Sequence, residues 1–103
     1  MKLVIYDNNG NVSADINVQL DKYMIIITPR ILDDELSYLH YKLLPVRTKY
    51  MTEYLYYIEY DKSEYTAKVL EQDIVDEIYG ILDNEIKYLQ TEDNKTFDLK
   101  IEN

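Results

Sequence analysis

The stretch LVIYDNNGNVSADINVQL, residues 3–20, decides the fold class because it has the pattern of a β-hairpin. Its centre is Asn9-Gly10, a pair that suits a type I′ turn because both central residues of that turn need positive φ. A turn at this point places Ile5 opposite Ala14 and Leu3 opposite Ile16. The alternating apolar side chains of the two strands then share one face, which predicts a sheet with one buried side.

A third strand is expected directly after this hairpin. A tight turn at Asp21-Lys22 would place Val18 opposite Ile25 and Ile16 opposite Ile27. Residues 23–28 are apolar on both faces of such a strand, so we expect this strand to be central in the sheet or covered.

Two stretches have helical periodicity. The first begins at Thr28-Pro29, a cap followed by a residue favoured at the first helical position, and Pro45 ends it, although Asp33 offers a slightly later cap. Its apolar stripe consists of Leu32, Leu36, Leu39 and Leu43. The stripe of the second consists of Ile74, Val75, Ile78, Ile81, Leu82, Ile86 and Leu89. We therefore predict helices at about residues 29–44 and 72–90.

The segment YLYYIEY, residues 54–60, is rich in aromatic residues and is expected to be a strand. Paired with residues 65–70, it would form a tyrosine-rich hairpin that buries Tyr56 and leaves Glu53, Tyr57 and Glu59 on a mixed, solvent-facing side. A helix remains an alternative, because Tyr50, Met51, Tyr54, Tyr57 and Ile58 also fit a helical stripe. Phe97, Leu99 and Ile101 alternate with charged residues and predict a C-terminal strand at a sheet edge. The expected fold is a small single α+β domain over residues 1–103, mainly antiparallel sheet with two helices.

Composition narrows the function classes. Twenty acidic and eleven basic residues give a net charge of −9, and residues 71–103 hold ten of the acids and three of the bases. A field of this sign repels nucleic acid and anionic membranes but steers the chain toward basic protein surfaces. The chain lacks cysteine and any apolar run long enough to span a membrane, so we expect a cytoplasmic protein.

No residue pattern indicates catalysis. His40 is the only histidine, and no motif supplies it with a partner for acid–base chemistry. Two acidic clusters could each hold a cation by their carboxylates, namely residues 33–35 and the set Asp73, Asp76 and Glu77, but acidic first turns also favour the helix dipole. We therefore expect a non-enzymatic protein without a cofactor or metal.

An acidic stripe on the second predicted helix is the strongest candidate for a partner-binding surface. It consists of Asp73, Asp76, Glu77 and Asp83. No base lies among these four residues, whereas a helix that is merely solvated usually intersperses lysine or arginine. Four charges along about 15 Å of helix give roughly one per 4 Å, close to the 3.4 Å per charge of a DNA strand. The stripe therefore resembles a nucleic-acid backbone in charge density.

Twelve tyrosines and a single phenylalanine add a second feature, because tyrosine is enriched in recognition surfaces. We expect the partner-binding residues to be Asp73, Asp76, Glu77, Asp83, Tyr57, Glu59 and Glu53. The corresponding hypothesis is a protein that inhibits a nucleic-acid-binding protein by occupying its basic site. Compact, acidic, cysteine-free chains of this kind resemble viral or phage counter-defence proteins, including anti-CRISPR and anti-restriction inhibitors, and would act in the host cytoplasm.

One alternative is a structural or assembly subunit that homo-oligomerises through its tyrosine-rich face. A basic region bears on this alternative, because His40, Lys42, Arg47 and Lys49 occur with no acid among them. This region would complement the acidic helix of a second copy in a homodimer, or pair with it within one chain.

Overall fold

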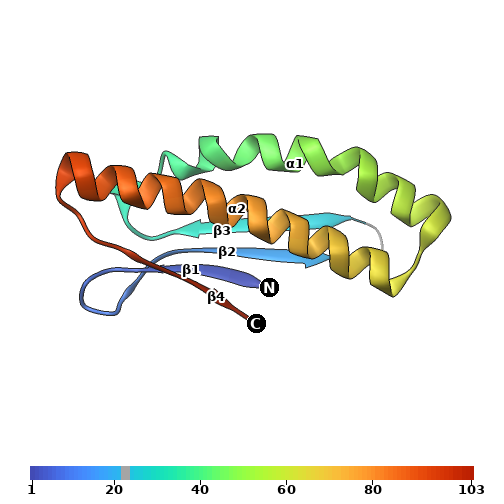
Figure 1. Cartoon of the computed structure of the whole chain (residues 1–103), viewed down its shortest axis with the longest axis horizontal. Helices are drawn as coiled ribbons and strands as arrows, with labels where there is room; N and C mark the ends of the chain where they lie inside the picture. Colours follow the sequence, from blue (N-terminus) through green and yellow to red (C-terminus); the bar gives the residue numbers. More distant parts are fainter. Residues whose placement is uncertain (22–23) are drawn as a thin grey trace.

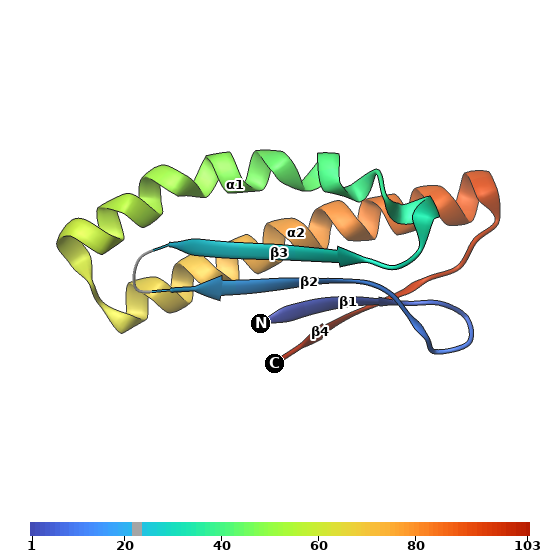
Figure 2. The same cartoon turned by 180° about the vertical axis from the view of Figure 1, so that it is seen from behind.

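The computed structural model describes residues 1–21 and 24–103, and in these it has an antiparallel sheet covered on one face by two helices (Figures 1 and 2). The strands are β1 (Lys2–Tyr6), β2 (Val12–Leu20), β3 (Ile25–Ile31) and β4 (Asp98–Glu102), and their order is β3-β2-β1-β4. The long helices are α1 (Leu39–Tyr56) and α2 (Glu64–Asp93). A 3-10 turn, η1 (Asp34–Leu36), precedes α1, and a π-helical turn, η2 (Tyr57–Asp61), follows it. The predicted α+β class is confirmed.

The N-terminal hairpin has the predicted register, with Ile5 opposite Ala14 and Leu3 opposite Ile16. Its turn is longer than the predicted two residues. The last pair before the turn is Tyr6 with Val12, one residue out of step with the pairs before it, so residues 7–11 form the connection. The Asp7 carboxylate accepts hydrogen bonds from the N–H groups of Asn9 and Asn11. Gly10 has a φ of 79°, a conformation that glycine adopts without steric cost.

The third strand is present, but its predicted register is wrong, and of its two expected placements, central or covered, the central one is wrong. Val18 lies opposite Ile27, two residues further along than predicted, and a shift of two keeps the same side chains facing the helices. β3 is an edge strand and not a central one. The expected turn at Asp21-Lys22 and the expected strand start at residue 23 include residues 22 and 23, which lie outside the described residues. Met24, next to them, is exposed.

The first helix lies further along the chain than the predicted 29–44. Thr28 and Pro29 continue β3, where they pair with Asn17 and Ile16. Proline is tolerated there because an edge strand does not need every N–H for the ladder. Pro45 lies inside α1 and does not end it. The alternative cap, Asp33, accepts a hydrogen bond from the Glu35 N–H and caps η1.

The predicted tyrosine-rich hairpin is wrong, because residues 54–60 form the end of α1 and most of η2. The helical alternative is correct: Tyr50 and Tyr54 are buried one turn apart, and Tyr57 is half-buried and stacks on Tyr54 with the ring centroids 5.7 Å apart. Tyr56, predicted to be core, is 61% exposed. The partner segment 65–70 forms the first turns of α2, which Ser63 caps by accepting from the Thr66 N–H at 3.0 Å.

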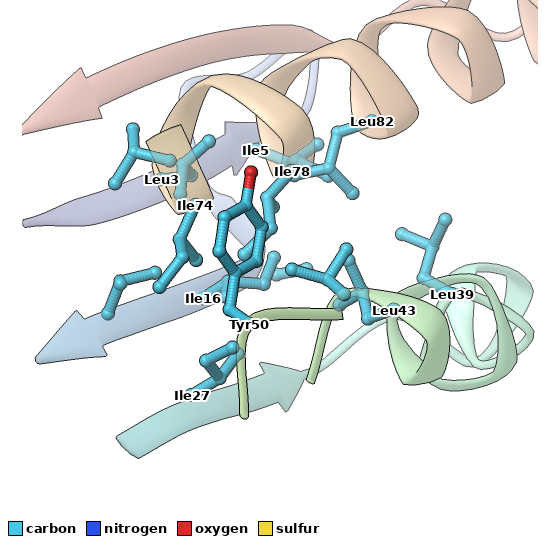
Figure 3. Packing of buried hydrophobic residues seen from close by; sticks show 14 of the residues in the cluster. Leu3, Ile5, Ile16, Ile27, Leu39, Leu43, Tyr50, Ile74, Ile78 and Leu82 are labelled. Carbon is cyan, nitrogen blue, oxygen red and sulfur yellow. The ribbon is translucent and has the colours of Figure 1, made fainter. Parts of the chain in front are cut away.

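The core lies between the inner face of the sheet and the two helices (Figure 3). Ile74, Ile78 and Leu82 of α2 are fully buried against side chains of β1 and β2 such as Leu3, Ile5 and Ile16. This confirms the second predicted helix, which extends beyond residues 72–90 at both ends. The C-terminal strand is also confirmed, because β4 pairs with β1 at the sheet edge. The molecule is elongated, with extents of 48, 23 and 18 Å.

Candidate functional site

Three of the predicted binding residues lie at one end of the long axis, where α1 turns back into α2 (Figure 1). We call residues 53–65 the hairpin tip; it comprises the end of α1, η2 and the start of α2. Glu53 and Glu59 are exposed there, whereas Tyr57 is half-buried. Asp73, Asp76 and Glu77 follow in α2, and Asp83 lies about two turns further from the tip.

The predicted acidic stripe does not form one uniform surface. Asp73 and Asp76 are exposed, and Asp76 accepts a hydrogen bond from the Gln72 amide at 2.8 Å. Glu77 instead turns toward α1 and accepts hydrogen bonds from Lys49 and, at 3.0 Å, from the Tyr50 hydroxyl. The bond from Lys49 is the main cause that lowers the pKa of Glu77 below its ordinary value, and the Tyr50 bond acts in the same direction.

Asp83 is also partnered, by an ion pair with Lys87 at 2.9 Å. The two residues are four apart on one helix, a spacing that brings side chains together. The sequence already contained this signal, and it means that a base lies at the far end of the stripe. Asp73 and Asp76 are therefore the members of the stripe that the structure leaves exposed and without an ion pair among the residues it describes.

The basic region of α1 pairs largely within the chain. Lys49 binds Glu77, and Lys42 forms an ion pair with Glu85 at 3.2 Å. Arg47 donates a hydrogen bond to the Ile27 carbonyl of β3, while His40 is exposed. Of the two alternatives for this region, intramolecular pairing accounts for the two lysines.

Two tyrosine hydroxyls strengthen the contact between the helices. The Tyr38 hydroxyl donates to Glu85 at 3.0 Å, and the Tyr50 hydroxyl donates to Glu77 at the same distance. Burial, followed by these hydrogen bonds to carboxylates, raises the pKa of Tyr38 and the pKa of Tyr50 to about 12. Both groups hold the two helices together and are not candidates for partner contacts.

The hairpin tip and the neighbouring turns carry most of the unbalanced charge. Residues 50–77 contain eight acids and two bases. The acids are Glu53, Glu59, Asp61, Glu64, Glu71, Asp73, Asp76 and Glu77. The bases are Lys62 and Lys68. Because most of these acids lie on exposed turns, this end of the molecule has a strongly negative surface.

Three tyrosine rings are exposed at the same end. Tyr56, Tyr60 and Tyr65 are 61%, 71% and 78% exposed, and the rings of Tyr56 and Tyr60 lie 5.3 Å apart. The strand prediction missed them because it placed Tyr56 in the core. Their helical spacing was the available signal, since Tyr56 and Tyr60 are four residues apart, whereas Tyr50, Tyr54 and Tyr57 follow the buried stripe.

A largely apolar groove of about 590 Å³ lies between α1 and the edge strand β3. Met24 and residues 25–28 line it from the β3 side, and Met51, Leu55 and Ile58 line it from the helix side. Among the described residues that line it, Arg47 is the charged one. The sequence prediction missed this groove because it ended the helix at Pro45.

Metal binding and membrane spanning can be compared with the described residues. Across residues 1–21 and 24–103, no three of the histidine, aspartate and glutamate side chains gather to hold a metal ion. Within the same ranges, no helix has the length and apolarity needed to cross a membrane.

No family model, curated protein or solved structure matches the chain.

Proposed function

We propose that the protein is a non-enzymatic binding protein whose hairpin tip occupies a basic site on a nucleic-acid-binding protein and thereby inhibits it. One observation carries the proposal: exposed carboxylates and exposed tyrosine rings share the same end of an elongated molecule. A viral or phage counter-defence inhibitor of the anti-CRISPR or anti-restriction type would act in this way, in the cytoplasm of the host cell.

The chemistry of the tip complements that of a nucleic-acid site. Such sites combine lysine and arginine, which contact phosphates, with aromatic or guanidinium planes on which bases stack. Glu53 and Glu59 of the tip, together with Asp73 and Asp76 beyond it in α2, would take the place of phosphates, since each is exposed and forms no ion pair among the described residues. Tyr56, Tyr60 and Tyr65 would offer faces to arginine side chains, which stack well on aromatic rings.

Buried side chains on both sides of the tip fix its position against the core. Buried Tyr50 and Tyr54 anchor the end of α1, and Leu70 and Ile74 anchor the start of α2. Little conformational entropy would then be lost when the tip enters a partner's site, and this favours affinity. Glu77 belongs to the scaffold in this proposal, because its carboxylate is bound to Lys49 and Tyr50.

The test uses a tip variant with Glu53→Gln, Glu59→Gln, Asp73→Asn and Asp76→Asn. A control that neutralises two acids carries Asp34→Asn and Glu92→Gln, which are exposed acids of η1 and of the end of α2, away from the tip. Each protein is used to capture partners from cell lysate at low and at high salt, and the captured proteins are identified by mass spectrometry. Those captured are then assayed for binding to labelled oligonucleotides with and without the protein.

We expect the wild-type protein and the control to capture nucleic-acid-binding proteins at low salt and to block their binding to the oligonucleotide. The tip variant should bind them on the order of tenfold more weakly, because four rim charges at a few tenths of a kcal/mol each sum to that factor. Salt should weaken wild-type binding more than the residual binding of the variant. Equal capture by the tip variant, or captured proteins that still bind the oligonucleotide, would contradict the proposal.

A further inference from the structure

Helix α1 carries two apolar stripes, and only one of them faces the core. The inner stripe consists of Leu39, Leu43, Val46, Tyr50 and Tyr54, all buried. A second stripe, which we call the outer seam, continues from α1 into η2 and consists of Tyr41, Leu44, Thr48, Met51, Leu55 and Ile58. Tyr41, Leu44, Met51 and Leu55 are each more than half exposed, whereas Ile58 is half-buried and also packs against the core. The apolar surface of this helix therefore exceeds what its own fold uses.

The spacing of the outer seam is that of a coiled coil. Its members follow one another at intervals of three, four, three, four and three residues, which is the a and d pattern of the heptad repeat. Such a seam packs against another helix by inserting its side chains between those of the partner. Thr48 is the one polar member, and single polar residues at such positions fix the register of a helix pair.

The outer seam is continuous with the groove beside β3. Met51, Leu55 and Ile58 belong to both, and Met24 and Ile26 extend the apolar surface across the groove to the edge strand. A helix laid along the seam would therefore also cover the open side of the groove. In a chain with a net charge of −9, a contiguous apolar surface of this kind indicates an interaction site more than scattered exposed side chains do.

The charges beside the seam determine what fits it. In the heptad numbering, the residues that flank the first half of the seam include His40 and Arg47, and those that flank its end include Glu59 and Asp61. Arg47 uses part of its guanidinium for the Ile27 carbonyl and has further donors. In an antiparallel pair of identical helices these flanking positions face each other across the seam, so His40 of each chain would lie beside Asp61 of the other.

We propose that two copies of this chain associate through their outer seams, with the two α1 helices antiparallel about a twofold axis. The seam is self-complementary in this arrangement, because each layer pairs two different members of it. The layers are Tyr41 with Ile58, Leu44 with Leu55, and Thr48 with Met51, each formed twice across the axis. An isologous contact of this kind closes on itself and produces a dimer.

A parallel pair is disfavoured by the same charges. It would gather the basic halves of both seams at one end of the helix pair and the acidic ends of both at the other, where like charges repel. The proposal does not depend on the proposed function, since the outer seam differs from the exposed tyrosines of the hairpin tip, Tyr56, Tyr60 and Tyr65.

The first experiment measures the mass of the full chain in solution by light scattering or sedimentation over a dilution series. We expect a species of twice the 12.4 kDa chain mass that dissociates on dilution. Met51→Glu combined with Leu55→Glu should yield the monomer throughout, because each chain would bury two carboxylates in the contact, opposite Thr48 and Leu44 of the other chain. Tyr88→Glu, a change at a similarly exposed residue of α2, should leave the dimer intact. Circular dichroism confirms that each variant is folded.

The second experiment determines the relative orientation of the two helices. Because the chain has no cysteine of its own, every disulfide formed involves an introduced cysteine. Leu44→Cys and Leu55→Cys chains are mixed and oxidised, and the disulfides are identified by mass spectrometry. The antiparallel dimer should yield chiefly the mixed product that joins position 44 to position 55. Products that join like positions, or a statistical mixture, would overturn the arrangement. A wild-type chain that stays monomeric at high concentration would overturn the second copy as the occupant of the seam.

Discussion

At the scale of single residues, the choice of tyrosine over phenylalanine has a structural reason at two positions. The rings of Tyr38 and Tyr50 pack against the core, and their hydroxyls donate to Glu85 and Glu77 of α2. Each of these carboxylates also binds a lysine of α1. Each site therefore joins a ring, a carboxylate and a lysine, so that apolar packing and charge pairing act together between the two helices.

Because the pKa values of these two hydroxyls are raised in the folded protein, we expect the protein to lose stability at alkaline pH. The pKa of both tyrosines is raised from 10.0 to about 12 in the folded protein. Between these values the unfolded chain releases the two protons and the folded chain keeps them, so the unfolding free energy should fall as pH rises from 10 to 12. Denaturant unfolding at a series of pH values measures this slope. Tyr38→Phe combined with Tyr50→Phe should make it shallower.

The same double variant supplies its own control. Below about pH 9 neither tyrosine ionises in either state, so wild type and variant should there differ by a constant amount only. A variant whose stability falls as steeply as that of the wild type between pH 10 and 12 would show that other groups cause the loss.

At the scale of elements, the glycine of α2 is the clearest place to alter stability. Gly80 lies mid-helix, and a Cβ built there meets nothing within 4 Å. Gly80→Ala should therefore stabilise the protein by roughly 0.5–1 kcal/mol, because glycine loses more backbone freedom in a helix than alanine does. The shift appears in the denaturant midpoint with an unchanged m-value.

Gly10 provides the opposite case. Its φ of 79° lies in the left-handed region, so Gly10→Ala should destabilise the hairpin, by about 1–2 kcal/mol. If both alanine variants shifted the midpoint in the same direction, the assignment of the two glycines to different backbone conformations would be wrong.

The elements that could be predicted from sequence are those whose periodicity has one interpretation. The hairpin of β1 and β2 alternates strictly, the apolar residues of α2 keep helical spacing over several turns, and β4 alternates again. The first helix could not be placed, because Thr28-Pro29 has the chemistry of a helix start and Pro45 that of a helix end. In the structure, Thr28 and Pro29 instead pair with β2 as part of β3, and Pro45 lies at an exposed position inside α1.

The candidate site was predictable only in part for a related reason. Exposure of Asp73 and Asp76 follows from the periodicity of α2 alone. The pairing of Glu77 with Lys49 depends on how α1 and α2 lie against each other, and no local pattern determines that. The outer seam was also hidden, because its heptad spacing becomes visible only once residues 46–58 are known to be helical.

At the scale of the whole molecule, charge and shape are coupled. The net charge is −9, and eight of the acids lie within residues 50–77, toward one end of a long axis of 48 Å. The ion pairs Lys49–Glu77, Lys42–Glu85 and Lys87–Asp83 neutralise acids locally, but surface pairs contribute little stability. We therefore expect the self-repulsion of the unpaired acids to be the larger electrostatic contribution to the free energy of unfolding.

This repulsion predicts that salt stabilises the fold. The Debye length falls from about 30 Å at 0.01 M to about 10 Å at 0.1 M ionic strength, so repulsion across the tip is screened while ion pairs in contact are screened less. The melting temperature of dilute protein should rise over this range, by about 4–8 °C if about 1 kcal/mol of repulsion is removed. The tip variant with four neutralised acids has a net charge of −9 + 4 = −5 and should melt higher at low salt and respond less. A melting temperature that falls with salt in both proteins would mean that attraction within the ion pairs of α1 and α2 outweighs the repulsion. The acids of the tip would then not destabilise the folded state, and binding would not be needed to explain why the chain keeps a destabilising cluster of charge.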